Sequence, residues 1–138
     1  MPKYALHFGA TLENLPLIRY FVQQRLKPHL PDSIQLNQVT VAVEELCSNS
    51  ILHANKEDPT RQLRLQLHIQ KKAIHIYLHD PAPPYDIHSY PSEPQLLRKG
   101  TLRPGGFGIY LMRKFIDRIH VRRGKRDGSI YHMVKEIS

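Results

Sequence analysis

The sequence lacks the features that mark an exported or membrane-spanning protein. Its one cysteine is Cys47, so no intrachain disulfide can form, which fits a reducing compartment. No apolar run approaches the ~18 residues that a transmembrane helix needs. The opening segment, Met-Pro-Lys-Tyr-Ala-Leu-His, does not contain the apolar core of a signal peptide. We therefore expect a cytoplasmic protein that has no membrane partner.

Acidic side chains are also scarce, with 12 Asp and Glu against 20 Lys and Arg, for a formal net charge of +8. Between Arg98 and Arg126, ten basic residues accompany one acid, Asp117. Such a stretch attracts anionic partners, although it can equally be a solvated face that only aids solubility. No helix-turn-helix, zinc-finger or aromatic RNA-binding motif accompanies the charge. Direct nucleic-acid binding is therefore not expected.

The hydrophobic pattern predicts one domain, residues 1–138, without internal repeats. Apolar residues that alternate predict strands, and apolar residues at helical spacing predict helices. The expected strands are residues 3–10, 63–70, 74–80, 118–123 and 129–136, and the expected helices are residues 13–27, 33–54 and 105–116. Residues 81–104 contain six prolines and are expected to form a long loop.

Two polar residues of the second expected helix could perform chemistry. Glu45 and Asn49 are four residues apart and share one helical face, so they can act on a common ligand. A carboxylate accepts a proton from a hydroxyl group or water, and a carboxamide oxygen is a hard ligand that suits Mg²⁺. Taken alone, such a pair is more often a solvated polar face than a catalytic site.

Asp80 ends an expected strand on the same face as Ile74, Ile76 and Leu78. A carboxylate on an apolar face needs a hydrogen-bond donor, because an unpaired buried charge is costly. The exocyclic amine of adenine would serve as that donor. The alternative is an aspartate that caps a turn at the end of the strand.

The last expected helix is preceded by the glycine-rich segment Gly105-Gly-Phe-Gly108. Glycines at a helix N-terminus let backbone N–H groups approach a phosphate, and the helix dipole favours the anion. The segment lacks the Gly-Lys-Ser/Thr ending of a P-loop and the spacing of a dinucleotide fingerprint. A plain glycine-rich turn is the alternative to a phosphate site.

Two histidines, His68 and His75, fall opposite each other if residues 71–72 form a two-residue hairpin. A metal site would need further ligands, and the sequence has no HExxH motif or cysteine pair. We expect an exposed cross-strand pair at these positions. Cys47 is expected to be a small core residue.

The order and spacing of these motifs are more specific than any one of them. The motifs are Val41-Ala-Val-Glu-Glu-Leu-Cys-Ser-Asn49, Asp80-Pro-Ala-Pro-Pro-Tyr-Asp86 and Gly105-Gly-Phe-Gly108. Together they resemble the ATPase domain of histidine kinases and gyrase-type topoisomerases, the Bergerat fold. The chain looks most similar to the short anti-sigma-factor serine kinases of bacterial partner switching. The resemblance implies an α+β, two-layer α/β sandwich in which helices cover one face of a mixed, mostly antiparallel sheet.

The resemblance also implies a role for each motif. In that family the residue that matches Glu45 activates an acceptor serine as the base, the match to Asn49 binds Mg²⁺, and the match to Asp80 receives the adenine amine. The segment that meets the phosphates corresponds here to Gly105, Gly106, Phe107 and Gly108. Residues 86–104 would form the ATP lid, from which Lys99 or Arg103 could reach the terminal phosphate.

The first glycine box departs from the family pattern. It usually reads Asp-x-Gly, sometimes with a second glycine two residues later, whereas this chain has Ala82 and Pro84. Alanine fits such a position if its φ is negative. Members of the serine-kinase branch often read Gly-x-Pro-Phe-Asp, which Pro84-Tyr-Asp86 resembles. Ala82 is therefore the unusual member of the cofactor-binding set.

The function implied by the resemblance is that of an ATP- and Mg²⁺-dependent serine protein kinase that acts as an anti-sigma factor. Its expected partners are a sigma factor and a small antagonist protein that carries the acceptor serine. The resemblance also suggests a homodimer. The alternative is a module that binds nucleotide or protein without catalysis, and Ala82 is the feature that favours it.

Overall fold

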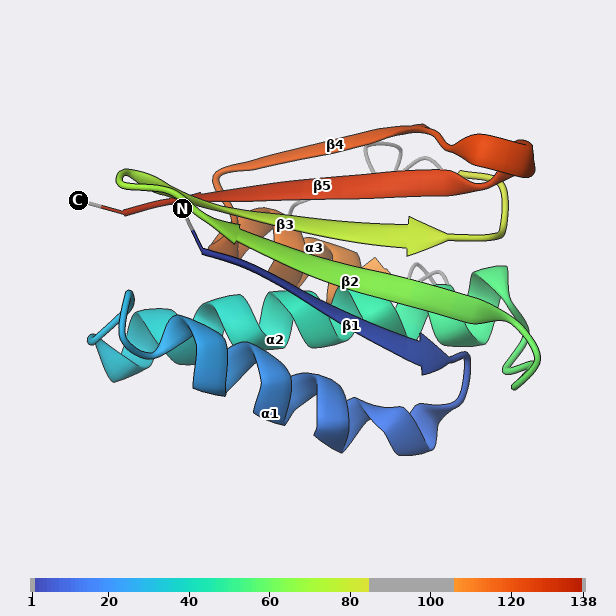
Figure 1. Cartoon of the computed structure of the whole chain (residues 1–138), viewed down its shortest axis with the longest axis horizontal. Coiled ribbons are helices and arrows are strands. Elements are labelled where there is room, and N and C mark those ends of the chain that lie inside the picture. Colours follow the sequence, from blue (N-terminus) through green and yellow to red (C-terminus); the bar gives the residue numbers. More distant parts are fainter. Residues whose placement is uncertain (1, 85–105, 138) are drawn as a thin grey trace.

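The computed structural model describes residues 2–84 and 106–137. A sheet forms one layer and three helices form the other, so that the helices cover one face of the sheet (Figure 1). This arrangement confirms the expected two-layer sandwich. The elements in chain order are β1 (Lys3–Gly9), α1 (Leu15–Leu26), α2 (Ser33–Asn49), β2 (Gln62–Ile69), β3 (Ala73–Asp80), α3 (Gly106–Phe115), β4 (Arg118–Arg123) and β5 (Ser129–Glu136).

The strand order in the sheet is β1-β2-β3-β5-β4, and every neighbouring pair of the described strands is antiparallel. The β2–β3 hairpin places His68 opposite His75, as the sequence predicts, but both side chains are half-buried rather than exposed. Strand β5 pairs with β3 although α3 and β4 lie between them in the sequence, and Asp80 is opposite Ser129 in that ladder. Strand β3 therefore lies at the centre of the sheet, with Asp80 at its end.

The hydrophobic core lies between the sheet and the helices. One buried cluster contains Leu65 and Leu78 from the sheet and Ile18 and Val43 from the helices. Cys47 is fully buried in this cluster, which confirms the expectation for it. No helix in the described part of the chain is both long enough and apolar enough to cross a bilayer.

Helix α2 begins and ends with identifiable contacts. At its N-terminus the Asp32 side chain accepts a hydrogen bond from the Ile34 N–H at 2.8 Å, as a cap should. At its C-terminus the chain continues as a π-helical turn, residues Ser50–Ala54, rather than as the expected α-helix. The Asn55 N–H accordingly donates to the Ser50 carbonyl, five residues earlier, at 2.9 Å. This wider turn leaves His53 exposed and Asn55 buried.

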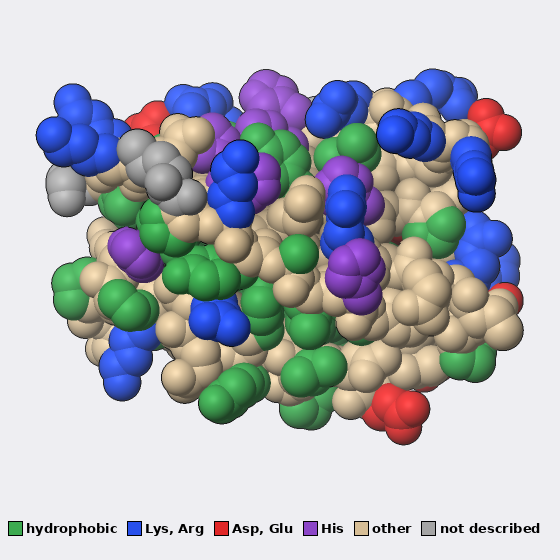
Figure 2. Space-filling model, in the orientation of Figure 1, with side chains coloured by type: hydrophobic (Ala, Val, Ile, Leu, Met, Phe, Trp, Pro, Cys, Tyr) green, Lys and Arg blue, Asp and Glu red, His purple; other side chains and the backbone are tan. Residues whose placement is uncertain are grey.

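The sheet face that points away from the helices, called the open sheet face below, carries rings and cations. Strand side chains alternate, so the residues between the buried apolar ones lie on this face. Figure 2 shows histidine, lysine and arginine side chains over the strands, with acidic side chains at the margins of the view. The histidines of this face are His7, His68, His75, His79, His120 and His132.

Candidate functional site

Helix α2 presents Glu45 and Asn49 toward the start of α3. Asn49 is 5% exposed and Glu45 is half-buried. Burial, and then the neighbouring carboxylate of Glu44, raise the pKa of the Glu45 carboxyl. A carboxylate with a raised pKa holds a proton more readily, which suits a general base. Glu44 lies on a different side of the helix and pairs with Arg19 at 2.8 Å.

The glycine at position 108 allows α3 to approach these two side chains closely. A Cβ atom at Gly108 would overlap Glu45 Oε2 and would lie 3.4 Å from Asn49 Nδ2. The glycine-rich segment and the Glu45–Asn49 pair, which are about sixty residues apart in the sequence, therefore form one site. The sequence predicts both parts of this site, and the packing of α2 against α3 brings them together.

The variant Gly108→Ala is expected to displace the Glu45 carboxylate without unfolding the chain. The added methyl group meets the end of a flexible side chain rather than backbone, so Glu45 can rotate away. Alanine is also a better helix former than glycine. We expect phosphotransfer to fall by more than ~10-fold, as for a misplaced base, with an unchanged melting temperature. An unchanged rate would show that the carboxylate position does not matter for the reaction.

Asp80 lies at the end of β3 with its side chain turned into the helix layer, 4% exposed. Its Oδ1 atom accepts two hydrogen bonds, from Asn55 Nδ2 at 2.9 Å and from the Ala82 N–H at 2.8 Å. Its Oδ2 atom has no hydrogen-bond partner within the described residues. One oxygen is thus fixed by the protein, and the other is left as a buried acceptor.

Ala82 fits the first glycine box without backbone strain. Only four non-glycine residues of the described chain have a positive φ, and Ala82 is not among them. Its N–H binds Asp80, and its carbonyl accepts a hydrogen bond from Ser129 Oγ at 2.8 Å. Alanine can therefore replace glycine at this position, because the backbone φ is not positive. Ala82 acts here through its backbone, which any residue with this conformation supplies.

Asn55 and Arg61 are site residues that the sequence patterns did not identify. The Asn55 amide donates to Asp80 Oδ1 and also to the Ser50 carbonyl, at 2.8 Å. Arg61 Nε donates to Asn55 Oδ1 at 3.1 Å, which fixes the orientation of the amide. Asn55 therefore ties the end of α2 to the end of β3. In the sequence, Asn55 is only a polar residue just after a helix. Such residues are common at helix ends, so its role could not be recognised there.

Replacing Asn55 by Ala is expected to weaken nucleotide binding and to lower the melting temperature. The Asp80 carboxylate would lose one of its two donors, which typically costs about 1–3 kcal/mol for a buried group. Thermal melts and calorimetry with ATP measure the two effects. The matched control is Asn37→Ala, because Asn37 is exposed on α2. If Asn55→Ala bound ATP as well as the control, Asn55 would not position Asp80.

Three buried side-chain atoms have no hydrogen-bond partner in residues 2–84 and 106–137. They are Asn49 Nδ2, Ser50 Oγ and Asp80 Oδ2, and all belong to the adjoining ends of α2 and β3. Buried polar atoms are rarely left unpaired in proteins unless a ligand or water completes them. The polar edge of adenine carries an amine donor beside ring-nitrogen acceptors. An acceptor on Asp80 together with a donor on Ser50 matches that chemistry, and Asn49 lies farther along α2, beside Gly108.

Some of the other predicted site residues lie in the described part of the chain and others lie outside it. Gly106, Phe107 and Gly108 form the first turn of α3, as expected for a helix N-terminus that meets phosphate. Lys99, Arg103 and Gly105, with the rest of the expected lid at 86–104, lie outside the described residues. Burial raises the pKa of the Cys47 thiol, so this cysteine is not a reactive nucleophile.

The two-layer fold and the order of the three motifs together match the class of ATPase-type α/β sandwiches. Residues 8–135 match the family model described as a histidine kinase-like ATPase domain. Because this match covers most of the chain, the chain belongs to that family.

Two known relatives match nearly the whole chain at low identity, and a third matches 63% of it. The anti-sigma F factor of Anoxybacillus flavithermus is 21% identical over 96% of this chain and 91% of its own length. The anti-sigma F factor of Oceanobacillus iheyensis is 24% identical over 97% of this chain and 92% of its own length. The serine-protein kinase RsbW of Bacillus licheniformis is 28% identical over 63% of this chain and 57% of its own length.

A solved structure of the RsbU and RsbW domains of a Mycobacterium tuberculosis protein has the same fold. It superimposes with a TM-score of 0.65 over 98% of this chain, at 9% identity. The present chain spans 32% of that longer protein.

Proposed function

We propose that this protein is an ATP- and Mg²⁺-dependent serine protein kinase that also sequesters a regulatory partner, with a sigma factor as the preferred candidate. The observation that carries the proposal is the group of unpaired buried atoms at Asn49, Ser50 and Asp80, next to Glu45 and Gly108. The names of the relatives, anti-sigma F factor and serine-protein kinase, support the same activity.

Each residue has a separate role in the proposed reaction. Asp80 Oδ2 would accept the adenine amine, and the first turn of α3 would direct its backbone N–H groups to the phosphates. Asn49 would supply a hard oxygen ligand to Mg²⁺. Bound ATP supplies the phosphoryl group, and Mg²⁺ neutralises its charge. Glu45 would accept the proton of the acceptor serine, for which its raised pKa is suited.

The direct test is to incubate the protein with labelled ATP, Mg²⁺ and a candidate antagonist protein encoded near its gene. We expect phosphoserine on the antagonist. Normal ATP binding without phosphoserine would disprove the kinase activity.

A binding module without catalysis is the alternative that the substitution of Ala82 for glycine raises in the sequence, but the unstrained backbone of Ala82 removes that argument for it. Calorimetry with ATP and ADP distinguishes the two. A kinase is expected to show Mg²⁺-dependent binding, whereas a protein-binding scaffold is expected to show none.

A further inference from the structure

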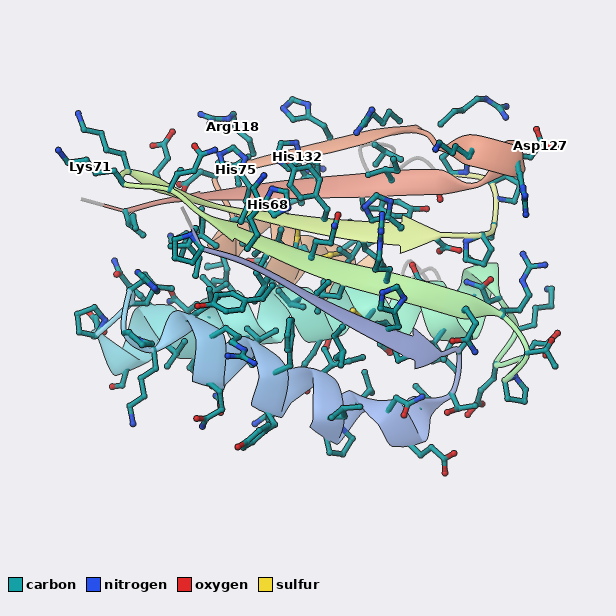
Figure 3. The ribbon with its side chains drawn as sticks, in the orientation of Figure 1. His68, Lys71, His75, Arg118, Asp127 and His132 are labelled. Carbon is teal, nitrogen blue, oxygen red and sulfur yellow. The ribbon has the colours of Figure 1, made fainter. Side chains whose placement is uncertain are left out.

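The open sheet face contains a row of planar rings contributed by four strands. The rings of Tyr77 and His132 stack with centroids 4.2 Å apart and planes 13° apart. His75 stacks on His132 at 5.0 Å, and its Nδ1 is 2.8 Å from His132 Nε2. His68 is 4.9 Å from Tyr77, and His120 is 6.1 Å from His132. Figure 3 shows His68, His75 and His132 close together on the sheet. These five residues are called the ring row below.

Two histidines of the ring row, His68 and His132, have lowered pKa values and are uncharged at neutral pH. Burial and the neighbouring cationic groups lower the pKa of His132 to about 4. Burial also lowers the pKa of His68, with Lys3 and His75 adding to the effect. The row therefore offers aromatic surface rather than positive charge.

Permanent positive charge flanks the ring row. Lys3, Arg64 and Arg122 lie on the same face, in register with the strands that carry the rings. None of these three forms an ion pair with another described residue, whereas Arg118 pairs with Glu136 at 2.8 Å. Glu136 is the one acidic side chain that the described strands place on this face. The face thus combines neutral rings with uncompensated cations.

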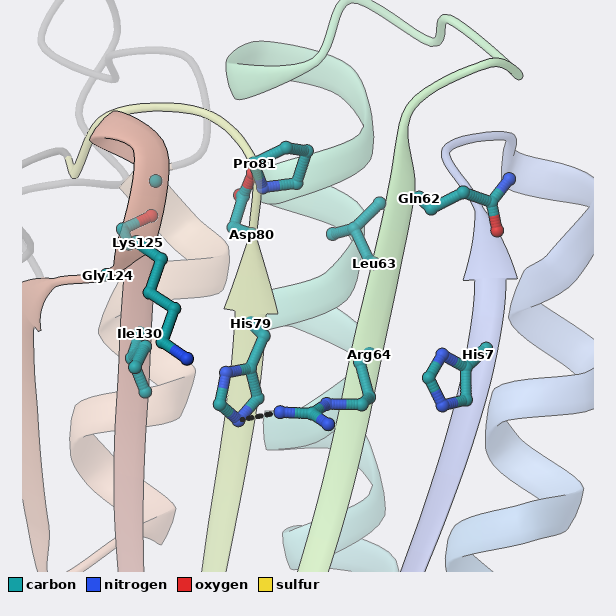
Figure 4. Close-up of a pocket in the computed structure, with 12 residues that line it drawn as sticks. His7, Gln62, Leu63, Arg64, His79, Asp80, Pro81, Gly124, Lys125 and Ile130 are labelled. Carbon is teal, nitrogen blue, oxygen red and sulfur yellow. Dashed lines mark hydrogen bonds between the residues drawn. The ribbon is translucent and has the colours of Figure 1, made fainter.

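A groove of about 420 Å³ continues this surface at the end of the sheet. Figure 4 shows His7, Arg64 and His79 on neighbouring strands, with Lys125 on the opposite side of the groove. Asp80 also lines the groove, but its Oδ1 is bound by Asn55 and Ala82 and its Oδ2 is buried in the helix layer. The groove therefore has cationic groups and no available carboxylate among the described residues.

The Arg64 guanidinium has N–H donors that can bind a ligand in this groove. His79 Nε2 lies 2.7 Å from Gln66 Oε1 and 3.3 Å from an Arg64 nitrogen. One ring nitrogen cannot donate to Gln66 and accept from Arg64 at the same time. When His79 donates to Gln66, over the shorter distance, Arg64 can direct its N–H groups to an anion instead.

We propose that the open sheet face binds single-stranded nucleic acid, with bases packed against the edges of the ring row and phosphates at Arg64, Arg122 and Lys125. Neutral rings between cations suit alternating bases and phosphates. An acidic peptide would use the cations but gain little from the rings. A second copy of the chain would bring two cationic faces together. The charge of the chain allows nucleic acid as one of several anionic partners but does not choose it; the ring row, assembled from strands distant in sequence, supplies the second feature. The inference does not rest on the proposed kinase activity.

Fluorescence anisotropy with a labelled oligouridylate of about twelve nucleotides tests the proposal. At about 0.15 M salt we expect binding that is stronger than binding to a duplex of equal length. Tyr77→Ala should weaken binding by about 10-fold or more, whereas Tyr77→Phe should retain it because the ring remains. Arg64→Ala should make binding less sensitive to salt, so that the plot of log affinity against log salt concentration becomes less steep by about one.

Three controls distinguish binding at this face from binding through overall charge, through the nucleotide site or through unfolded protein. Lys27→Ala removes the same charge from the exposed end of α1 and should change binding little. ATP at a concentration that saturates the nucleotide site should leave oligonucleotide binding intact, because Asp80 Oδ2 of that site is buried in the helix layer, away from the open sheet face. Thermal melts confirm that each variant is folded. Equal binding of duplex, an unaffected Tyr77→Ala variant, equal losses in Lys27→Ala and Arg64→Ala, or displacement of the oligonucleotide by ATP would each overturn the proposal. A polyglutamate peptide that binds more tightly than the oligouridylate would point to an acidic protein partner instead, which also overturns the proposal.

Discussion

Glu45→Gln is expected to slow phosphotransfer to the antagonist by ~10²–10⁴-fold, the usual contribution of a general base. Glutamine keeps the length and shape of the side chain beside Gly108 but cannot accept the serine proton. ATP affinity should change little, because Asp80 and the first turn of α3 are unchanged. Single-turnover rates at saturating ATP, together with calorimetry, measure the two quantities separately.

The sequence provides a matched control one residue earlier. Glu44 carries the same charge on the same helix but is engaged with Arg19 at 2.8 Å. Glu44→Gln should therefore retain a rate near that of the unmodified protein. It should also move the acid side of the pH–rate profile to lower pH, because Glu44 helps to raise the pKa of Glu45. If Glu45→Gln abolished ATP binding instead of the chemical step, the assignment of the base would be wrong.

Asp80→Asn is expected to weaken ATP binding by about 1.5–3 kcal/mol, roughly 10- to 150-fold, through loss of a charge-assisted hydrogen bond. The remaining amide oxygen can still accept from Asn55 and Ala82, so the amide nitrogen takes the place of Oδ2. That nitrogen is a donor and would face the donor amine of adenine. A guanine carbonyl at the same position would accept a hydrogen bond from that nitrogen. The affinity of the variant for GTP should therefore rise relative to its affinity for ATP.

Calorimetry with ATP and GTP measures both effects of this change. Asp127→Asn is the control, because Asp127 is an exposed acid whose φ of 63° asparagine tolerates well. Melting curves of both variants exclude unfolding as the cause. Unchanged ATP affinity in Asp80→Asn would mean that the nucleotide does not contact this carboxylate.

The helices and strands could be predicted because they depend on local periodicity, and so could the positions of Glu45, Asn49 and Asp80. Alternation placed Asp80 on the apolar face of its strand, and the four-residue spacing placed Glu45 and Asn49 together. Both rules hold whatever the rest of the chain does. The π-helical turn after Asn49 was not predictable, because no residue in Ser50–Ala54 distinguishes it from an α-helical turn.

The hydrogen-bond network and the ring row could not be predicted because they depend on long-range packing. Asn55 reaches Asp80 only after the end of α2 meets the end of β3. The hairpin rule predicts that His68 faces His75, but His132 joins them through a ladder between strands about fifty residues apart. No local pattern in the sequence encodes that pairing.

The central position of β3 makes nucleotide binding depend on a strand that is synthesised about fifty residues later. One edge of β3 pairs with β2, and the other stays open until β5 arrives. The same strand brings Ser129, whose hydroxyl holds the Ala82 carbonyl beside Asp80. During synthesis the segment up to Asp80 thus carries Glu45 and Asn49 but also an unpaired central edge, which is prone to aggregate. At the proposed site, ATP would therefore stabilise the closed sheet of the finished protein by mass action.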